Sequence, residues 1–530
     1  MQFYQVVKIP EYRRTAKDIN VKEEYVMVRV GLDVPLDITK DLLDPARVTD
    51  DTRIKDIIPT LKYLIQNKAK IILAAGWCGR PKGIDPDYSM APVAKRLELI
   101  LKERNMLKHS VLIAPNCYED KTPKSVYKNR EEVAKIVKGL KPGQIAVLEN
   151  VRYDPEANAN DTDFAAFFAS LADVYINENE TQNHRKEATI VTTPLLIAEK
   201  GGEVVYGLKY VEVLDKIGSL KQKLENPKRG FFVFGLCGKK IESDPGITSK
   251  ITVAIGLIDK MRKGDFIITG GAVTYTFILA QHYSPKIKAN LEKANQIVKK
   301  YDEKIISRTK DKKAEEAEAI TKEIQKEKSK ELKNLAGIYD EEINKLVGNS
   351  YIRWGQEGEQ IVFAYNLIAK ANAKGVEVIT AYDHTITNKA PDKRGMLPKD
   401  AEIKIYQNPT GIPQGWLGVG EGTKTLKKIA DIIENAGIYL QSGPYSIEDS
   451  RVEEASNTNK ITFEAAKRCK EAGGITIGAG GDTVARINSI KAEDSFSVIS
   501  NAGGATLELI ETGTSVGKKA VEEAQKFKKQ

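Results

Sequence analysis

The sequence predicts an α/β protein with two similar lobes, each a Rossmann-like parallel sheet covered by helices. Three observations lead to this prediction. The chain has 530 residues, which is more than one ordinary hydrophobic core supports. Short apolar runs alternate with segments of helical periodicity, a pattern typical of βαβ units. The alternation occurs as two successive series along the chain.

The first series contains short strands separated by amphipathic helices. The predicted strands are 26–32, 70–76, 110–116, 145–151 and 174–177, and helical segments include 57–67, 91–102 and 164–172. Almost continuous apolar strands are typical of parallel sheets that are buried on both faces. Ligands of such sheets bind beyond the carboxyl ends of the strands, so we expect a site in the loops that follow them.

A second series repeats the pattern. Its predicted strands are 230–237, 265–271, 375–383, 438–444, 474–483 and 495–500. Pro194, Gly201 and Gly202 interrupt the pattern between the series, and residues 209–226 predict a helix that joins the lobes as a hinge. We therefore expect an N-terminal domain at 1–205, to which a tail at 505–530 returns, and a C-terminal domain at 206–504.

A highly charged segment interrupts the second series. Residues 291–345 contain 14 basic and 13 acidic residues, no proline and one glycine, with apolar residues at helical spacing. We expect a helical insertion within 287–350 of the C-terminal domain. A charged helical protrusion needs no partner, because its charges can support one another in water. Docking to another protein through 291–345 is the alternative, and both interpretations stay open.

Composition restricts the classes of function. Apolar residues make up 41% and charged residues 29%, with no uncharged apolar run long enough to span a bilayer. We expect a cytoplasmic protein without membrane or nucleic-acid partners, since no basic block is interleaved with aromatic residues. The net charge of +9 instead suits a pocket for anionic metabolites. The four cysteines lack metal-ligand spacing, so we expect reduced thiols and no structural metal.

Four glycine-containing loops follow apolar runs and precede helical ones. They are 269–277, 441–446, 478–486 and 501–508. Backbone N–H groups and helix N-termini in such loops can face a phosphate. A single loop of this kind is more often a turn that requires glycine, but four in one lobe favour a nucleotide site. The GxxxxGK[ST] phosphate-binding motif does not occur.

The order of short motifs resembles that of the phosphoglycerate kinase family. VMVRVGLDVPLD is similar to VLVRVDFNVPLD, GRPKG to the end of SHLGRPKG, and LENVRYDPE to LENVRFHPE. SLADVYIN followed by HR is similar to SLADVYVNDAFGTAHR, and GGAVTYTFILAQ to GGGMAYTFLKAQ. SGP, GGDT and GGATLE follow in the family's order. The resemblance extends nearly from end to end.

The resemblance implies a two-lobed glycolytic kinase. Such an enzyme binds 3-phosphoglycerate in the N-terminal lobe and ATP or ADP with Mg²⁺ in the C-terminal lobe, and closes to transfer a phosphoryl group. It implies catalytic roles for Arg53 and Lys240, and substrate contacts from Asp33, Arg80, Arg152, His184 and Arg185. Asp482 would reach Mg²⁺ through the nucleotide. The implied nucleotide-binding residues are Lys250, Gly270, Gly271, Pro444, Asp449, Gly481, Asp482, Thr483, Gly503 and Gly504.

Several positions depart from the family pattern. Trp77 and Glu187 replace two histidines, and Gly31 replaces an aspartate, all in the implied triose site. A carboxylate about 5 Å from a phosphate costs on the order of 3 kcal/mol at an effective dielectric constant of about 20, unless an arginine intervenes. In the C-terminal lobe, an expanded loop separates Lys240 from Lys250.

Three interpretations remain open. The first is a divergent but active phosphoglycerate kinase. The second is a catalytically impaired relative that acts as a structural or assembly component through its helical insertion. The third is a kinase with a changed acceptor, because the basic residues remain while those expected to contact the triose hydroxyl groups differ.

Overall fold

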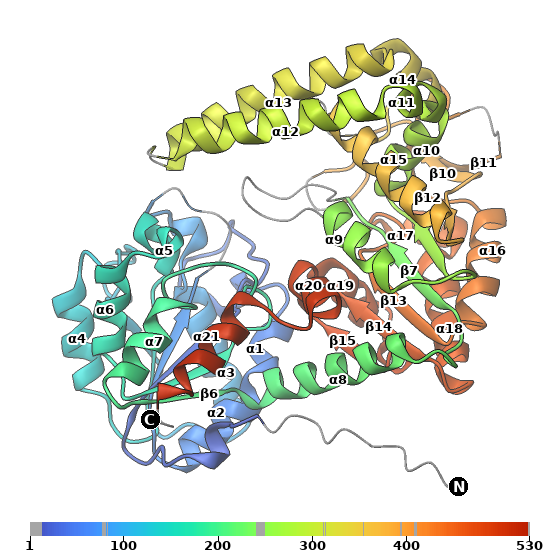
Figure 1. The fold of residues 1–530 in the computed structure, drawn as a ribbon. Coiled ribbons are helices and arrows are strands. Elements are labelled where there is room, and N and C mark those ends of the chain that lie inside the picture. Colours follow the sequence, from blue (N-terminus) through green and yellow to red (C-terminus); the bar gives the residue numbers. More distant parts are fainter. Residues whose placement is uncertain are drawn as a thin grey trace, which may run out of the picture. The chain divides into compact units, whose positions relative to one another are not determined.

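The computed structural model describes residues 13–76, 81, 83–239, 250–310, 312, 314–352, 355–392, 395–407 and 411–527. The chain divides into two compact units. Unit 1 consists of Met1–Ser219 and Thr512–Gln530, and unit 2 of Leu220–Glu511. Helix α8 (Leu208–Glu225) crosses the boundary between them along the chain. Figure 1 shows a helix-flanked sheet in each unit.

The sheet of unit 1 has six strands in the order β3-β4-β2-β1-β5-β6, and all its pairings are parallel. These strands are apolar along most of their length because helices cover both faces. Their bounds are β1 Tyr25–Val30, β2 Lys70–Ala75, β3 Leu112–Ala114, β4 Ile145–Leu148, β5 Val174–Glu178 and β6 Glu203–Tyr206.

The helices of unit 1 bury apolar faces against this sheet. They include α1 Thr52–Asp56, α2 Ile58–Gln66, α3 Ala91–Glu103, α4 Arg130–Lys138, α6 Thr162–Ser170 and α7 Thr192–Glu199. The chain's last helix, α21 (Val516–Ala524), packs against α7 and β6. The Gln525 side chain beyond it donates a 3.0 Å hydrogen bond to the Val204 carbonyl. The C-terminal segment is therefore part of unit 1.

Unit 2 contains a second parallel six-stranded sheet, in the order β15-β14-β13-β7-β8-β9. Counted within the unit, this is the 3-2-1-4-5-6 order of dinucleotide-binding folds, and its topological switch point lies between β7 and β13. The bounds are β7 Phe232–Leu236, β8 Phe266–Thr269, β9 Glu377–Ile379, β13 Ile438–Ser442, β14 Ile475–Ala479 and β15 Val498–Ser500.

A small antiparallel sheet and a set of helices accompany the parallel sheet of unit 2. The antiparallel sheet, which the sequence patterns did not predict, has the order β11-β10-β12. Its strands are β10 His384–Thr387, β11 Ile403–Tyr406 and β12 Leu417–Glu421. The main helices of the unit are α9 Lys250–Leu257, α10 Val273–His282, α15 Glu357–Ala373, α16 Thr423–Glu434, α17 Ser450–Ser456, α18 Thr458–Glu471, α19 Gly481–Ser489 and α20 Gly504–Thr512.

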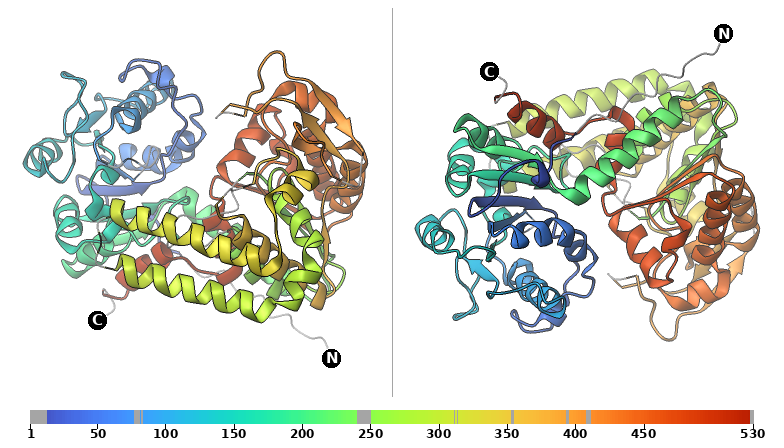
Figure 2. Two further views of the ribbon diagram at one scale, coloured as in Figure 1. Left: turned by 90° about the horizontal axis from the view of Figure 1, so that it is seen from above. Right: turned by 90° about the horizontal axis from the view of Figure 1, so that it is seen from below.

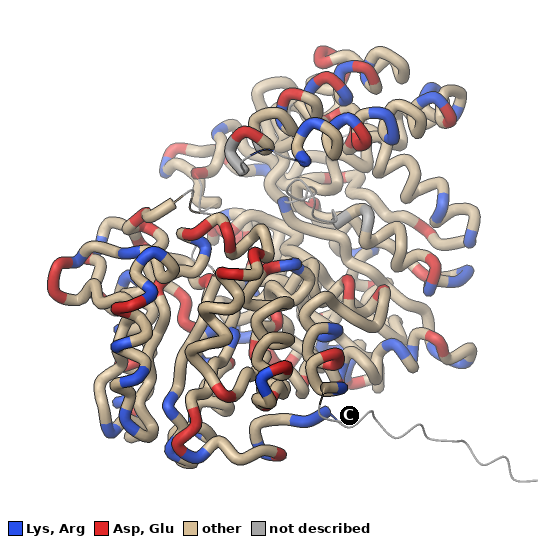
Figure 3. Tube along the Cα trace, turned by 60° about the vertical axis from the view of Figure 1, so that its left-hand side comes forward, with Lys and Arg blue, Asp and Glu red and all other residues tan. Residues whose placement is uncertain are grey.

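The charged segment forms two long helices, α12 (Leu291–Thr309) and α13 (Ala314–Ala336), which lie side by side in both views of Figure 2. Basic and acidic residues are interspersed along them (Figure 3). The pair is more than a solvated protrusion, because α13 also packs against α15. There the buried Lys328 ammonium lies 2.8 Å from Asp302 Oδ1 and 2.6 Å from Glu359 Oε1.

The two parallel sheets with flanking helices confirm the predicted α/β fold class. Cys117, Cys237 and Cys469 are buried free thiols. Among the described residues, no helix is both long and apolar enough to cross a membrane.

Candidate functional site

A cluster of arginines and carboxylates lies at the carboxyl ends of the unit 1 strands. This arginine cluster comprises Arg29, Asp33, Arg53, Arg152 and Glu187. Arg53 stands on α1, and its guanidinium donates to both the carboxylate and the backbone carbonyl of Asp33, just after β1. Both side chains are 17% exposed, so a ligand can still reach the pair.

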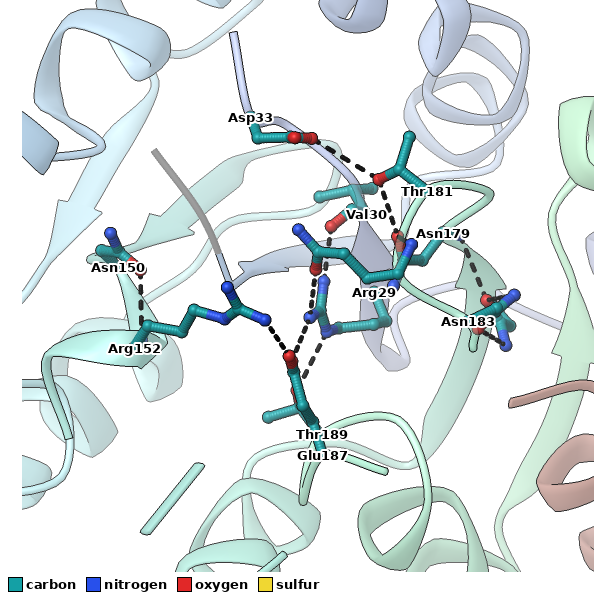
Figure 4. A network of polar contacts seen from close by, with 12 residues as sticks. Arg29, Val30, Asp33, Asn150, Arg152, Asn179, Thr181, Asn183, Glu187 and Thr189 are labelled. Atoms are coloured by element: carbon teal, nitrogen blue, oxygen red, sulfur yellow. Dashed lines mark hydrogen bonds and ion pairs between the residues drawn. The ribbon is translucent and has the colours of Figure 1, made fainter. Parts of the chain in front are cut away.

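Glu187 lies between the other two arginines (Figure 4). One of its oxygens is 3.1 Å from Arg29 Nη2, and the other accepts from Arg152 Nη2. The three side chains are at most 4% exposed. This arrangement changes the expectation that Glu187 opposes an anionic ligand directly, because arginines intervene.

The neighbouring arginines favour the ionised form of Glu187. Burial alone would raise the pKa of the Glu187 carboxyl, but Arg152 and Arg29 outweigh it and hold that pKa below its ordinary value. Burial lowers the pKa of Arg29, and Glu187 partly offsets the effect. Three further acceptors fix the Arg29 guanidinium, and they are Thr189 Oγ1 at 2.9 Å, the Val30 carbonyl at 2.6 Å and Gln182 Oε1 at 2.8 Å.

Two glycines make room for this network. A Cβ atom on Gly76, at the end of β2, would lie 2.6 Å from Arg29 Nη2 and 3.2 Å from Glu187 Oε2. A Cβ atom on Gly31, after β1, would lie only 2.3 Å from Thr181 Oγ1. Thr181 therefore fills the space that a side chain at position 31 would need. Gly31 stands where the family pattern has an aspartate, and this structure has no room for a side chain there.

His184 and Arg185 follow in the same loop. Burial, with Arg185 nearby, lowers the pKa of His184 to about 4, so the imidazole is neutral at neutral pH. Its Nδ1 atom is buried and has no hydrogen-bond partner among the described residues. A neutral imidazole can either donate or accept a hydrogen bond. His184 therefore suits a contact with a polar, uncharged group.

Several predicted site residues lie outside the described part of the structure. Trp77, Arg80 and Lys240 are not among the described residues. Lys250 begins α9, but its side chain is outside the described part of the structure. Among the described residues, no group of three or more His, Cys, Asp or Glu side chains is arranged to hold a metal ion.

In unit 2, a cluster of glycines lies at the switch point between β7 and β13. This glycine cluster comprises Gly238, Gly270, Gly271 and Gly443. Gly443 has φ +96°, and a Cβ atom there would lie 2.1 Å from the Cys237 carbonyl oxygen. Pro444 also packs here, with its Cδ 3.3 Å from an added Gly238 Cβ. The glycines allow backbone to pack directly against backbone.

The amides of two predicted phosphate-binding glycines already have partners. Gly270 N–H donates to the Leu236 carbonyl at 3.2 Å, and Gly271 N–H donates to Glu421 Oε1 at 2.9 Å. Burial raises the pKa of Glu421 to about 8, so this carboxyl is mostly protonated at neutral pH. The structure therefore uses both glycines for tight packing, and their amides do not point to an open phosphate site.

Two other side chains that were predicted to contact the nucleotide already bind groups within the protein. The Thr483 hydroxyl accepts from Gly443 N–H and donates to the Ala479 carbonyl, both at 2.8 Å, and Thr483 is fully buried. The Asp449 carboxylate caps α17 and binds Arg451, which lowers its pKa to about 2. Asp449 is only 2% exposed. These side chains stabilise loops, and neither presents a free oxygen to a nucleotide.

The remaining nucleotide-binding candidates stand at helix N-termini. Gly481 and Asp482 open α19, and Gly504 opens α20 directly after Gly503. A Cβ atom on Gly480 would lie 3.5 Å from Gly503 Cα, so the two loops lie close together. The first four N–H groups of a helix lack partners within the helix and favour anions. Asp482 is exposed beside them.

These features define a class of protein with two α/β units, one bearing a cationic cluster and the other glycine-rich loops at helix N-termini. The chain belongs to the phosphoglycerate kinase family, because the family model "Phosphoglycerate kinase" matches residues 16–344 and 335–513. This result confirms the resemblance inferred from the motifs.

Individual relatives agree along most of the chain. The cytosolic phosphoglycerate kinase of Triticum aestivum is 29% identical over 96% of this chain and 98% of its own length. That of Clostridium kluyveri is 28% identical over 94% and 96%. The phosphoglycerate kinase structure from Pyrococcus horikoshii superposes with a TM-score of 0.64 at 18% identity, covering 97% and 99% of the two chains. At this identity the structural similarity supports the fold alone.

Sequence reasoning missed three residues that organise the arginine cluster. Arg29 stands inside a predicted apolar strand, and a charged residue there was the available signal that it has a buried partner. Thr181 and Gln182 lie in a loop without regular periodicity. Their contacts with the Gly31 site and Arg29 depend on folding, so no local pattern could show them.

Proposed function

We propose that this protein catalyses reversible phosphoryl transfer between ATP and 3-phosphoglycerate. The observation that supports this most is the partly exposed pair of Arg53 with Asp33 after β1, where Thr181 Oγ1 of the loop after β5 lies 3.5 Å from Asp33 Oδ1. Parallel α/β sheets bind ligands at this edge. Guanidinium groups suit phosphate and carboxylate oxygens because their planar forks bind in a bidentate manner.

In this proposal, each part has a separate task. Arg53 neutralises charge on the phosphoryl group in transit, and Asp33 holds its guanidinium in place. Arg185 and Arg80 attract the acid, while neutral His184 contacts a hydroxyl group. The N-termini of α19 and α20 bind the nucleotide phosphates, Asp482 contacts the Mg²⁺ that arrives with the nucleotide, and Lys240 and Lys250 add positive charge. Phosphoryl transfer depends mainly on such positioning and charge stabilisation.

A specific observation favours a second candidate. Arg152, a predicted substrate contact, is held by Glu187 inside unit 1. Loss of this contact would weaken acid binding, as expected of an impaired relative that serves as an assembly component. In that case α12 and α13 would carry the partner-binding function.

A coupled assay that follows NADH oxidation with ATP and 3-phosphoglycerate tests the proposal. We expect turnover, and we expect Arg53→Ala to reduce kcat by about 10³-fold or more, in the range of arginines that stabilise a transferring phosphoryl group. Arg14→Ala is the matched control, because Arg14 pairs with Glu203 at 3.0 Å on the same unit and should leave the rate unchanged. The proposed activity would be refuted if the wild type showed no turnover. It would also be refuted if Arg53→Ala and Arg14→Ala turned over at the same rate.

A further inference from the structure

We propose that Glu187 determines the affinity of the acceptor site, by acting as an internal counter-ion that keeps Arg152 from the acidic substrate. The inference rests on the proposed function, because it concerns the same acceptor. Glu187 replaces one of the two histidines of the family pattern in the implied triose site. A carboxylate there brings a permanent negative charge where the family has a group that is neutral or positive.

The geometry supports a counter-ion rather than a substrate contact. Both Glu187 oxygens are engaged, one with Arg29 and one with Arg152, and the side chain is 3% exposed. A carboxylate between two guanidinium groups supplies, from within the protein, the negative charge that both arginines can bind. The two arginine charges are thus partly cancelled inside the protein, before any substrate arrives.

The surrounding residues are fitted to this arrangement. Gln182 and Thr189 hold Arg29 at 2.8 and 2.9 Å, so that guanidinium cannot turn toward a ligand. Gly76 has no side chain, and any Cβ atom there would collide with Arg29. Arg152 approaches from the opposite side, from the loop after β4. Arg29 is therefore held by groups other than Glu187, and the inference concerns the contact between Glu187 and Arg152.

A purely structural role for Glu187 makes a different prediction. If the residue only stabilises the core, its replacement lowers the melting temperature and leaves the affinity for substrate unchanged or weaker. If it is a counter-ion, its replacement improves acid binding selectively. The improvement must also depend on Arg152, and the affinity for the nucleotide must not change.

The test is calorimetric titration of 3-phosphoglycerate into the full chain, as wild type, Glu187→Gln, Arg152→Met and the double variant. We expect Glu187→Gln to lower Kd for 3-phosphoglycerate at least tenfold. We expect the gain to disappear in the double variant, which gives a coupling of at least about 1.4 kcal/mol, the equivalent of tenfold. The Kd of Mg-ADP serves as the internal control and should stay within twofold.

Glu187→Gln leaves Arg29 without its counter-charge, so Glu187→Gln combined with Arg29→Met provides a second version that removes both members of this pair and keeps Arg152. Either version, once its melting curve shows a folded protein, should bind the acid more tightly. Unchanged or weaker binding in a folded variant would overturn the inference, as would a gain that persists without Arg152. Tighter binding without turnover would support the inference and count against the proposed kinase alone.

Discussion

The arginine cluster of unit 1 and the glycine cluster of unit 2 stand at equivalent edges of two parallel sheets, yet they are built differently. In the first, side chains pair with side chains, as Glu187 does with Arg29 and Arg152. In the second, backbone packs against backbone, as at Gly443 and Cys237. A substitution in the arginine cluster changes a pairing of charges and leaves the backbone in place. A substitution in the glycine cluster forces the backbone itself to move.

The largest expected stability effect in this comparison is in the arginine cluster. Glu187→Gln leaves two guanidinium groups buried beside a neutral amide, and we expect the free energy of unfolding to fall by about 3 kcal/mol, since breaking a buried ion pair leaves an uncompensated charge. Urea denaturation measures this change. Glu212→Gln is the control, because its pair with Lys216 is exposed and should contribute less than about 1 kcal/mol.

A substitution in the glycine cluster should lower the free energy of unfolding nearly as much, although this cluster carries no charge. Gly443→Ala places a Cβ atom against the Cys237 carbonyl at a positive φ, so strain and steric overlap should together cost at least about 2 kcal/mol. Gly201→Ala separates the two effects, because Gly201 also has a positive φ, +84°, but nothing lies within 4 Å of its added Cβ. Equal melting temperatures for these two variants would show that backbone packing at the switch point contributes little.

A smaller, pH-dependent effect is expected where a carboxyl group supports the glycine cluster. The pKa of Glu421 is raised to about 8, so the folded protein retains a proton that the unfolded chain has already lost above its ordinary pKa of 4.5. Its contribution to stability is therefore present at low pH and is lost as the pH rises toward 8.

Glu421→Gln removes this dependence. Between pH 5 and 8, we expect the wild type to lose about 1 to 3 kcal/mol more free energy of unfolding than this variant. Urea denaturation at several pH values checks the difference, with the exposed Glu448→Gln as the control. If the free energies of unfolding of the wild type and Glu421→Gln changed in parallel with pH, the raised pKa of Glu421 would be contradicted.

The sequence predicted most of the parallel strands because they are buried on both faces and form apolar runs, but it placed β6, Glu203–Tyr206, in the join between the two series. The small antiparallel sheet escaped prediction because its strands are short and β11, IKIY, is only partly buried. Side-chain pairing was harder to foresee. Arg29 and Glu187 are 158 residues apart, and only the folded chain brings them together. Thr483 and Asp449 occupy family-like positions, but burial commits their oxygens to the protein's own loops.

The most direct test of the account is an experimental structure of the protein with Mg-ADP and 3-phosphoglycerate. The account predicts Arg53 in contact with the acceptor's reacting end, and Arg152 still paired with Glu187, away from the ligand. An Arg152 guanidinium bound to the acid, with Glu187 displaced from it, would contradict the central claim that this carboxylate controls the acceptor site.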